Sequence, residues 1–175
     1  FSFATGLRSL LRNDPDVILV GEIRDAETAE IAVRAAMTGH LVISTVHANT
    51  PVGAIKRLTN LNVDPTLLSD CLLGVYSQRL VRVYCSNCRE VSSTSQGHQS
   101  KLPVAFTGCK TCHYTGFKGR SPVMSHVEIT AENASLIETN PAKIMVIDTM
   151  YTEALDLYSK GLTPQFEITR LKHNV

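Results

Sequence analysis

Residues 14–25 read DPDVILVGEIRD, and this stretch is the strongest indication of the fold class. The aspartates and the proline at its start end a preceding helical pattern, because the residue before a proline is disfavoured in helical geometry. Val17 to Val20 form a continuous apolar run, which predicts a strand buried on both faces, as in a parallel sheet. Gly21 lets the chain turn, so Glu22 is expected at the carboxyl end of the strand, where open α/β sheets bind ligands.

Helical and strand patterns alternate on both sides of this stretch. Residues 2–12 carry apolar side chains at helical spacing, and a second helix is expected from an N-cap at Asp25 to about Met37, ending at Gly39. Residues 41–46 predict a second buried strand. Two further helices are expected where a capping residue precedes a proline, at Thr50-Pro51 and Asp64-Pro65. This order predicts an α/β fold with a parallel sheet covered by helices.

The second predicted strand also ends in polar residues, because Thr45 and His47 follow its apolar run. In a nucleotide triphosphatase, an acid at the position of Glu22 holds Mg²⁺ through water and orients the water that attacks the γ-phosphate. His47 could donate a hydrogen bond to phosphate or sense its presence. The alternatives are that Glu22 is a solvated loop residue, that His47 only begins a loop, and that His40 caps the helix ending at Gly39.

Four of the five cysteines form two Cys-x-x-Cys pairs separated by 20 residues: Cys85, Cys88, Cys109 and Cys112. Four thiolates at this spacing predict a closed, tetrahedral and therefore structural Zn²⁺ site in a reducing compartment. Disulfides, free thiols or His113 in place of one sulfur are the alternatives. Cys71 is expected to be a small buried apolar residue.

Charge and hydropathy exclude other classes of protein. The chain has 17 basic and 16 acidic residues and a net charge of +1, which argues against nucleic-acid binding. No run approaches the roughly 18 apolar residues of a membrane-spanning helix. The 175 residues contain no G-x-x-x-x-G-K-[S/T] phosphate loop and no start methionine, so we interpret the chain as a fragment that alone neither binds ATP tightly nor hydrolyses it.

Residues 6–58 closely resemble the traffic ATPases of type II secretion and type IV pilus assembly. DPDVILVGEIRD is similar to the Walker B segment of that family, and TGHLVISTVHAN at 38–49 is similar to its histidine box. LLGVYSQRLVRVYC at 72–85 and TGFKGR at 115–120 resemble the segments that flank its cysteine module. The resemblance covers residues 1–88 and 108–120, and the sequence departs from the family after Arg120.

The resemblance implies a catalytic set of Glu22 as Walker B glutamate with His47 and His40 of the histidine box, and Glu22 and Thr45 beside the nucleotide. It implies ATP and Mg²⁺ as cofactors, Zn²⁺ in a tetracysteine subdomain, and a phosphate loop N-terminal to this region. The parent protein is then an ATP hydrolase, cytoplasmic and peripheral at the bacterial inner membrane. It forms a ring of six subunits that passes motion to an inner-membrane platform protein.

Three regions are expected: the C-terminal part of a RecA-like ATPase core (1–84), the zinc subdomain (85–120) and a mainly helical region (121–175). In the last region we expect helices after Thr130, from about Pro141 to Ser159, and from Thr163-Pro164. Arg8, Arg12 and Arg24 are candidates for charge-stabilising residues or for contacts between subunits, and for Arg24 we favour a local ion pair with Asp25. The rival functions are a zinc-stabilised protein-interaction module without hydrolase activity and a retraction-type motor, a class that usually lacks the four cysteines.

Overall fold

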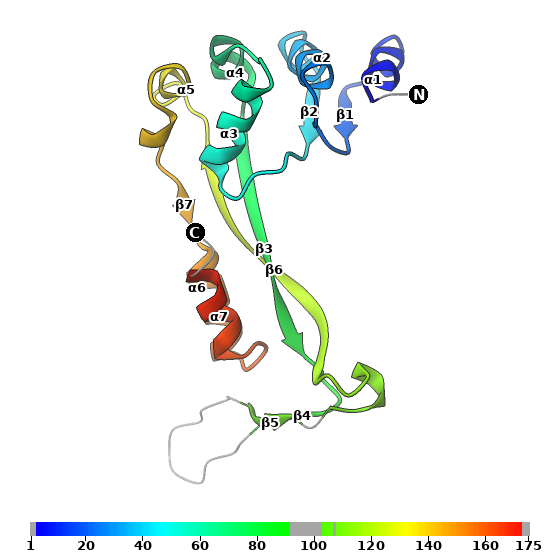
Figure 1. Cartoon of the computed structure of the whole chain (residues 1–175), viewed down its shortest axis with the longest axis vertical. Coiled ribbons are helices and arrows are strands. Elements are labelled where there is room, and N and C mark those ends of the chain that lie inside the picture. The colour runs from blue at the N-terminus through cyan, green and yellow to red at the C-terminus, as the bar shows by residue number, and fades with distance from the viewer. Residues whose placement is uncertain (1–2, 92–102, 107, 173–175) are drawn as a thin grey trace. The chain divides into compact units, whose positions relative to one another are not determined.

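The computed structural model of the chain describes residues 3–91, 103–106 and 108–172 (Figure 1). The chain forms two compact units, each built from two segments. Unit 1 comprises residues 1–77 and 126–147, and unit 2 comprises residues 78–125 and 148–175. Within the described ranges, no helix has the length and apolar character needed to cross a bilayer.

Unit 1 contains the alternation of helices and strands predicted from the sequence. Its elements are α1 (Phe3–Leu11), β1 (Val17–Val20), α2 (Ala26–Met37), β2 (Leu41–Ser44), α3 (Pro51–Asn60), α4 (Pro65–Cys71), α5 (Ser135–Thr139) and the 3₁₀ turn η2 (Pro141–Lys143). The α/β fold class is therefore confirmed. The second strand ends at Ser44, two residues earlier than expected.

Side-chain caps start the helices of unit 1 where the sequence predicts them. The Asp25 carboxylate accepts a hydrogen bond from the Thr28 amide (2.8 Å) at the start of α2. The Thr50 hydroxyl and the Asp64 carboxylate likewise accept amide hydrogen bonds at the starts of α3 and α4. These bonds satisfy amide groups that have no partner inside the helix.

β1 and β2 are parallel and in register, with Val17 opposite Leu41 and Val20 opposite Ser44. One face of this pair is covered, since Ile18 and Val20 are buried in the core that also contains the apolar sides of α1 to α4. In Figure 1, α1 and α2 lie side by side next to this pair of strands. Burial of this face therefore determines which side chains of the two strands point into the core.

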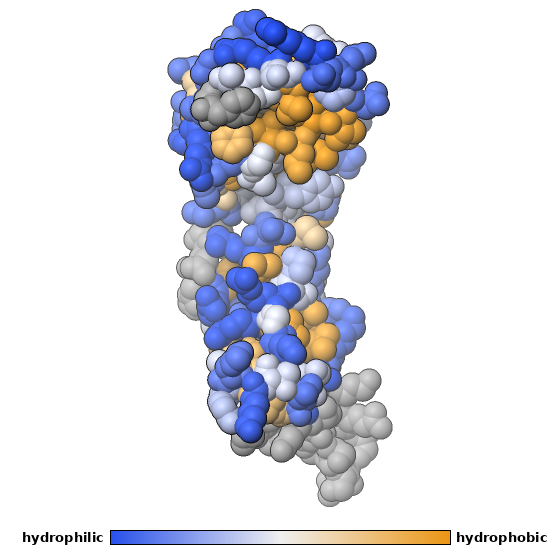
Figure 2. Space-filling view, turned by 90° about the vertical axis from the view of Figure 1, so that its right-hand side faces the viewer, coloured by the Kyte–Doolittle hydropathy of each residue, from blue (hydrophilic) through white to orange (hydrophobic). Residues whose placement is uncertain are grey.

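The prediction that both strands are buried on both faces is wrong for this chain. Val17 and Leu19 of β1 are 54% and 73% exposed, and Leu41 and Ile43 of β2 are 44% and 50% exposed. The physical reason is that the described helices pack on one face of the pair only. Phe3 and Leu10 of α1 are also exposed, and Figure 2 shows a hydrophobic patch in the upper part of the view.

A sheet of order β3-β6-β7 contributes to both units; its strands are β3 (Gly74–Tyr84), β6 (Phe117–Glu128) and β7 (Ile147–Asp148). At one end of the β3–β6 pair, the Ile129 amide donates to the Leu73 carbonyl, and at the other end the Cys85 amide donates to the Gly116 carbonyl. These contacts make β3 and β6 antiparallel. The tetracysteine segment therefore connects the ends of two long neighbouring strands.

Unit 2 has its own core, formed by Val81, Val123, Ala154 and Ile168. Two helices pack on its strands, α6 (Met150–Ser159) and α7 (Gln165–Lys172), and the 3₁₀ turn η1 (Lys110–Cys112) lies in the cysteine segment. Between the two Cys-x-x-Cys pairs, β4 (Arg89–Val91) and β5 (Pro103–Phe106) pair antiparallel. Residues 92–102 and 107 lie outside the described part of the chain.

The C-terminal region differs from the expectation in two places. Residues 121–128 belong to strand β6, although the region as a whole was expected to be mainly helical. A single helix from Pro141 to Ser159 is also wrong, because η2 and β7 precede α6. Ile144 is buried in the core of unit 1 and Ala154 in that of unit 2, so the intervening chain is extended to leave one core and join the other.

Candidate functional site

The carboxyl ends of β1 and β2 bring three of the predicted site residues together. The strands are parallel and in register, so the residues that follow them meet at one edge of the pair. The Ile23 amide donates to the Thr45 carbonyl (2.9 Å), and the Thr45 hydroxyl donates to the Gly21 carbonyl (2.6 Å). These two bonds extend the pairing past the strands and place Glu22 next to the segment that carries His47.

Glu22 lies between two cationic or potentially cationic side chains. Its Oε1 is 2.6 Å from Nε2 of His47, and its Oε2 is 2.6 Å from Nη2 of Arg24. The Glu22 side chain is 17% exposed, whereas those of His47 and Arg24 are 84% and 70% exposed. A carboxylate is thus held at the strand ends with an exposed imidazole beside it.

The surroundings of Glu22 favour its ionised form. The hydrogen bond from Arg24 lowers the pKa of this carboxyl below its usual value, outweighing the burial that raises it, and the charges of Arg24 and His47 lower it further. Oε1 is buried and, among the described residues, has no partner in regular hydrogen-bond geometry despite the short contact with His47. A carboxylate oxygen has two lone pairs, so Oε1 could accept a hydrogen bond from a water once a neighbouring side chain moves and opens it to solvent.

We expected Arg24 to pair with Asp25, but it pairs with Glu22. Asp25 is instead occupied as the N-cap of α2, where its two oxygens accept bonds from the amide and the hydroxyl of Thr28. The sequence reasoning therefore missed Arg24 as a neighbour of the candidate acid. The sequence signal that could have identified Arg24 is its position only two residues after Glu22.

His40 is not brought to this group of residues. It precedes β2, and its Nδ1 lies 3.0 Å from the Ala35 carbonyl oxygen and 3.2 Å from the Thr38 hydroxyl at the end of α2. The register puts Leu41 opposite Val17, at the end of the strand pair away from Glu22. In this chain His40 therefore acts as a cap for α2.

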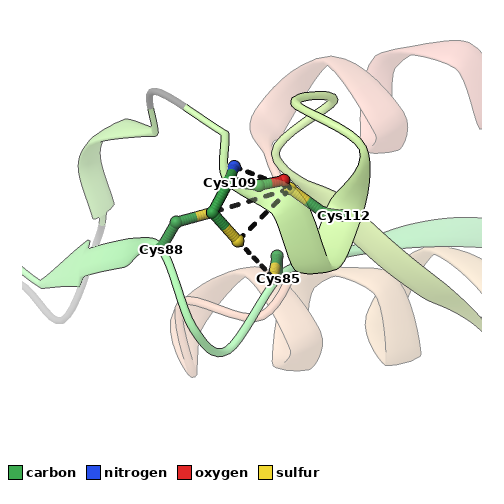
Figure 3. Close-up of side chains that lie close together, drawn as sticks. All are labelled: Cys85, Cys88, Cys109 and Cys112. Atoms are coloured by element: carbon green, nitrogen blue, oxygen red, sulfur yellow. Dashed lines mark hydrogen bonds between the residues drawn. The ribbon is translucent and has the colours of Figure 1, made fainter.

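The four cysteines of the two Cys-x-x-Cys pairs form a compact cluster in unit 2 (Figure 3). All four Sγ atoms lie within 4.8 Å of one another. The Sγ–Sγ distance is 3.8 Å for the pairs Cys85–Cys109, Cys88–Cys112 and Cys109–Cys112. Four sulfurs at the Zn–S distance of about 2.3 Å from a tetrahedral ion are separated by about 3.8 Å, so the donor set fits Zn²⁺.

The backbone around Cys112 also fits a thiolate. The amides of Cys109 and Gly116 donate to Cys112 Sγ at 3.1 and 3.3 Å. Burial would raise the pKa of Cys112, but these two amides hold it at about 6. In contrast, burial and the neighbouring sulfurs raise the pKa of Cys88 to about 12, as expected for crowded thiols without a cation.

The alternatives for the cysteines are less compatible with this arrangement. All five cysteines are free, so none of them forms a disulfide. His113 is exposed in the left-handed conformation (φ 51°) and does not belong to the cluster. Cys71 is only half-buried, against the core of unit 1, and burial raises the pKa of its thiol.

Comparison with known proteins places the chain in one family. The sequence profile of the family described as type II/IV secretion system protein matches residues 1–169. Type II secretion system protein E of Dickeya dadantii is 42% identical over 97% of this chain and 37% of its own length. Type II secretion system ATPase E of Vibrio cholerae is 38% identical, also over 97% of this chain and 37% of its own length.

Solved structures agree with the fold. The pilus retraction motor PilT with bound ADP superposes with a TM-score of 0.65 at 30% identity, covering 97% of this chain and 43% of the PilT chain. The Legionella pneumophila ATPase DotB superposes with a TM-score of 0.71 at 20% identity, which supports the fold alone. The fold is thus that of part of the PilT and DotB ATPases.

The chain belongs to the type II/IV secretion system protein family, with homologues among the type II secretion ATPases E. It spans about 37% of the length of the type II secretion relatives named above.

Proposed function

We propose that this chain is part of a hexameric ATP-hydrolysing motor that drives type II protein secretion or type IV pilus assembly. The observation that carries the proposal is the contact of Glu22 with His47 at the carboxyl ends of two parallel strands. That edge is where α/β sheets bind nucleotides. Relatives in the same family include a protein named as an ATPase.

Glu22 has the properties that a catalytic acid of this class needs. It is ionised and held by Arg24. When His47 turns away, Oε1 of Glu22 becomes open to accept a hydrogen bond from the attacking water or from a water bound to Mg²⁺. Mg²⁺ would supply neutralisation of the charge on the β- and γ-phosphates. Thr45 holds the turn after β1 through the Gly21 carbonyl, and so positions Glu22.

His47 is the proposed reporter of the phosphate. Its side chain is 84% exposed and contacts Glu22 through Nε2, so a γ-phosphate at this edge would compete with Glu22 for the imidazole. Loss of the phosphate would return His47 to Glu22. His40 takes no part in this exchange in our proposal, because it caps α2 at the other end of β2.

The tetracysteine cluster is proposed to hold a structural Zn²⁺ ion. Four thiolates fill a tetrahedral site and leave no position for water, so the ion would cross-link the two Cys-x-x-Cys turns rather than catalyse a reaction. We further propose that the parent protein is cytoplasmic and peripheral at the inner membrane. There it would act on a platform protein of the secretion or pilus machine.

The test of the proposal is Glu22→Gln in the full-length protein. We expect ATP turnover to fall by at least about 100-fold, the size of a lost general base, while sedimentation shows an assembled ring. Glu30→Gln is the matched control, because Glu30 is exposed on α2 and pairs only with Arg34 among the ion pairs of the described residues. Its turnover should equal that of the wild type.

His47→Ala and His40→Ala separate the two histidines. His47→Ala should lower turnover, whereas His40→Ala should leave turnover unchanged and lower only the thermal stability of the protein. Normal turnover of Glu22→Gln would show that Glu22 is not the catalytic acid, whereas a full-length wild type without ATP turnover would favour a protein-interaction module without hydrolase activity. An effect of His40→Ala as large as that of His47→Ala would show that the phosphate reporter is misplaced.

A further inference from the structure

Helix α7 of unit 2 carries a buried carboxylate. Glu167 is 2% exposed and accepts four hydrogen bonds or ion-pair contacts. The Arg82 amide donates to its Oε2 (3.1 Å), and Nε and Nη2 of Arg82 contact its Oε1 at 2.8 and 2.7 Å. Nη1 of Arg170 also donates to Oε1 (3.0 Å). Glu167 is therefore a fully paired charge inside unit 2.

Arg82 connects this carboxylate to the cysteine segment. It lies on β3, three residues before Cys85, and its guanidinium is 4.6 Å from the ring centre of Phe117. Phe117 begins β6 directly after the second Cys-x-x-Cys turn and stacks on Tyr84 with ring centres 5.5 Å apart. The Arg82 side chain thus links α7 to the two strands that lead into and out of the cysteine cluster, β3 and β6.

The chain before α7 makes the same connection through its backbone. The Thr163 hydroxyl, which is fully buried, donates to the Arg82 carbonyl (2.7 Å). The Tyr84 amide donates to the Leu162 carbonyl (2.8 Å), and Nη1 of Arg89, the residue after Cys88, donates to the Gly161 carbonyl (3.1 Å). Residues 161–163 therefore bind to the chain on both sides of the first Cys-x-x-Cys turn.

We propose that Glu167, Arg82 and Thr163 form a hydrogen-bond network through which helix α7 and the tetracysteine metal site stabilise each other. This inference rests on the proposed zinc site. Glu167 is then a positioning residue: it touches no ligand, but it fixes the strand that delivers Cys85 and Cys88 to the metal.

The coupling follows from two physical arguments. When thiolates lie in an unordered loop, part of the free energy of metal binding is used to order that loop. Contacts that already hold the loop in its metal-bound conformation therefore raise the metal affinity. Mutation of groups that orient metal ligands without contacting the metal lowers metal affinity by about 10–100-fold. Because equilibrium coupling is reciprocal, the bound metal must in turn hold α7 in place by the same factor.

The test measures zinc affinity and helix protection in the full-length protein. The apparent zinc dissociation constant is determined by competition with a chromophoric chelator for the wild type, Glu167→Gln and Asp156→Asn. Asp156 is the matched control, because it forms an exposed ion pair with Lys160 in the same unit. We expect Glu167→Gln to weaken zinc binding about tenfold and Asp156→Asn to leave it unchanged.

Hydrogen exchange of the wild type gives a second readout that needs no variant. Removing zinc should speed exchange of the α7 amides about tenfold, while α2 amides in unit 1 stay unchanged. Zinc-loaded wild type whose α7 exchange is insensitive to chelation would overturn the coupling, as would Glu167→Gln with wild-type zinc affinity. A wild type that binds no zinc would remove the metal site itself, and the coupling with it.

Discussion

Two glycines, one beside Cys109 and one on strand β6 just after the cysteine segment, provide a matched test of the zinc site. Gly108 precedes Cys109 and has φ +74°, and a Cβ there would lie 2.5 Å from the carbonyl carbon and oxygen of Tyr114. Gly119 has φ +89°, and a Cβ there would meet nothing within 4 Å. Alanine at either position incurs the cost of a left-handed backbone, about 1–2 kcal/mol. Only Gly108→Ala adds a steric clash.

The size of the difference follows from that clash. Ordinary contacts between heavy atoms begin at about 3.5 Å, so the Tyr114 backbone or Gly108 has to move by about 1 Å. Tyr114 is itself tied to the module, because its amide donates to the Cys109 carbonyl (2.9 Å). Metal–ligand distances tolerate about 0.2 Å, so the shift is too large for Cys109 to remain a good ligand. We expect Gly108→Ala to weaken zinc binding by about 10–100-fold.

The assay is the apparent zinc dissociation constant of both variants, measured by chelator competition, with thermal unfolding recorded alongside. Gly119→Ala should lower the thermal stability slightly and bind zinc as the wild type does. The reasoning is refuted if Gly108→Ala and Gly119→Ala bind zinc equally well, since the geometry of the second Cys-x-x-Cys turn would then not control the site.

Three further predictions concern the metal, pH and nucleotide. Metal analysis should find about one zinc per chain in the wild type and in Cys71→Ser but less in Cys112→Ser; retention in Cys112→Ser would contradict the cluster. Burial raises the pKa of Glu167, but hydrogen bonds from Arg82 outweigh it, so the pKa lies below its unfolded value of 4.5. The pairing of Glu167 with Arg82 therefore adds stability above pH 4.5 and loses it as pH falls through the lowered pKa. In urea unfolding, the free energy of unfolding of Glu167→Gln should fall less than that of the wild type when the pH is lowered from neutral through the pKa of Glu167. An equal fall in both proteins would contradict the stabilising pair of Glu167 with Arg82. Nucleotide titration of residues 1–175 should show no measurable ATP binding, and micromolar affinity would contradict the argument from the missing phosphate loop.

Local signals in the sequence were sufficient for much of unit 1. Asp25, Thr50 and Asp64 are helix caps because their side chains bond to amides two or three residues later, which a sequence displays directly. The cysteine cluster was likewise predictable, since four thiols at this spacing have few other arrangements. The meeting of Glu22 and His47 followed from two consecutive strands that run parallel.

The sequence could not predict features that depend on distant parts of the chain. Glu167 and Arg82 are 85 residues apart, and no local pattern marks Glu167 as buried or as the partner of Arg82. The burial of β1 and β2 depends on what covers each face, which a run of apolar residues does not specify. The break between Pro141 and Ser159 arises because Ile144 and Ala154 belong to different cores, although both fit one helical pattern.

The hydrogen bond between the Cys85 amide and the Gly116 carbonyl (2.8 Å) has a consequence for how this family can vary. The chain leaves β3 and enters β6 at almost the same point, so the 32 residues between these strands, 85–116, are an insertion at the tip of a hairpin. A short turn could join Tyr84 to Phe117 and leave both strands paired. Gain or loss of the metal-binding segment during evolution would then require no change in the remainder of the sheet.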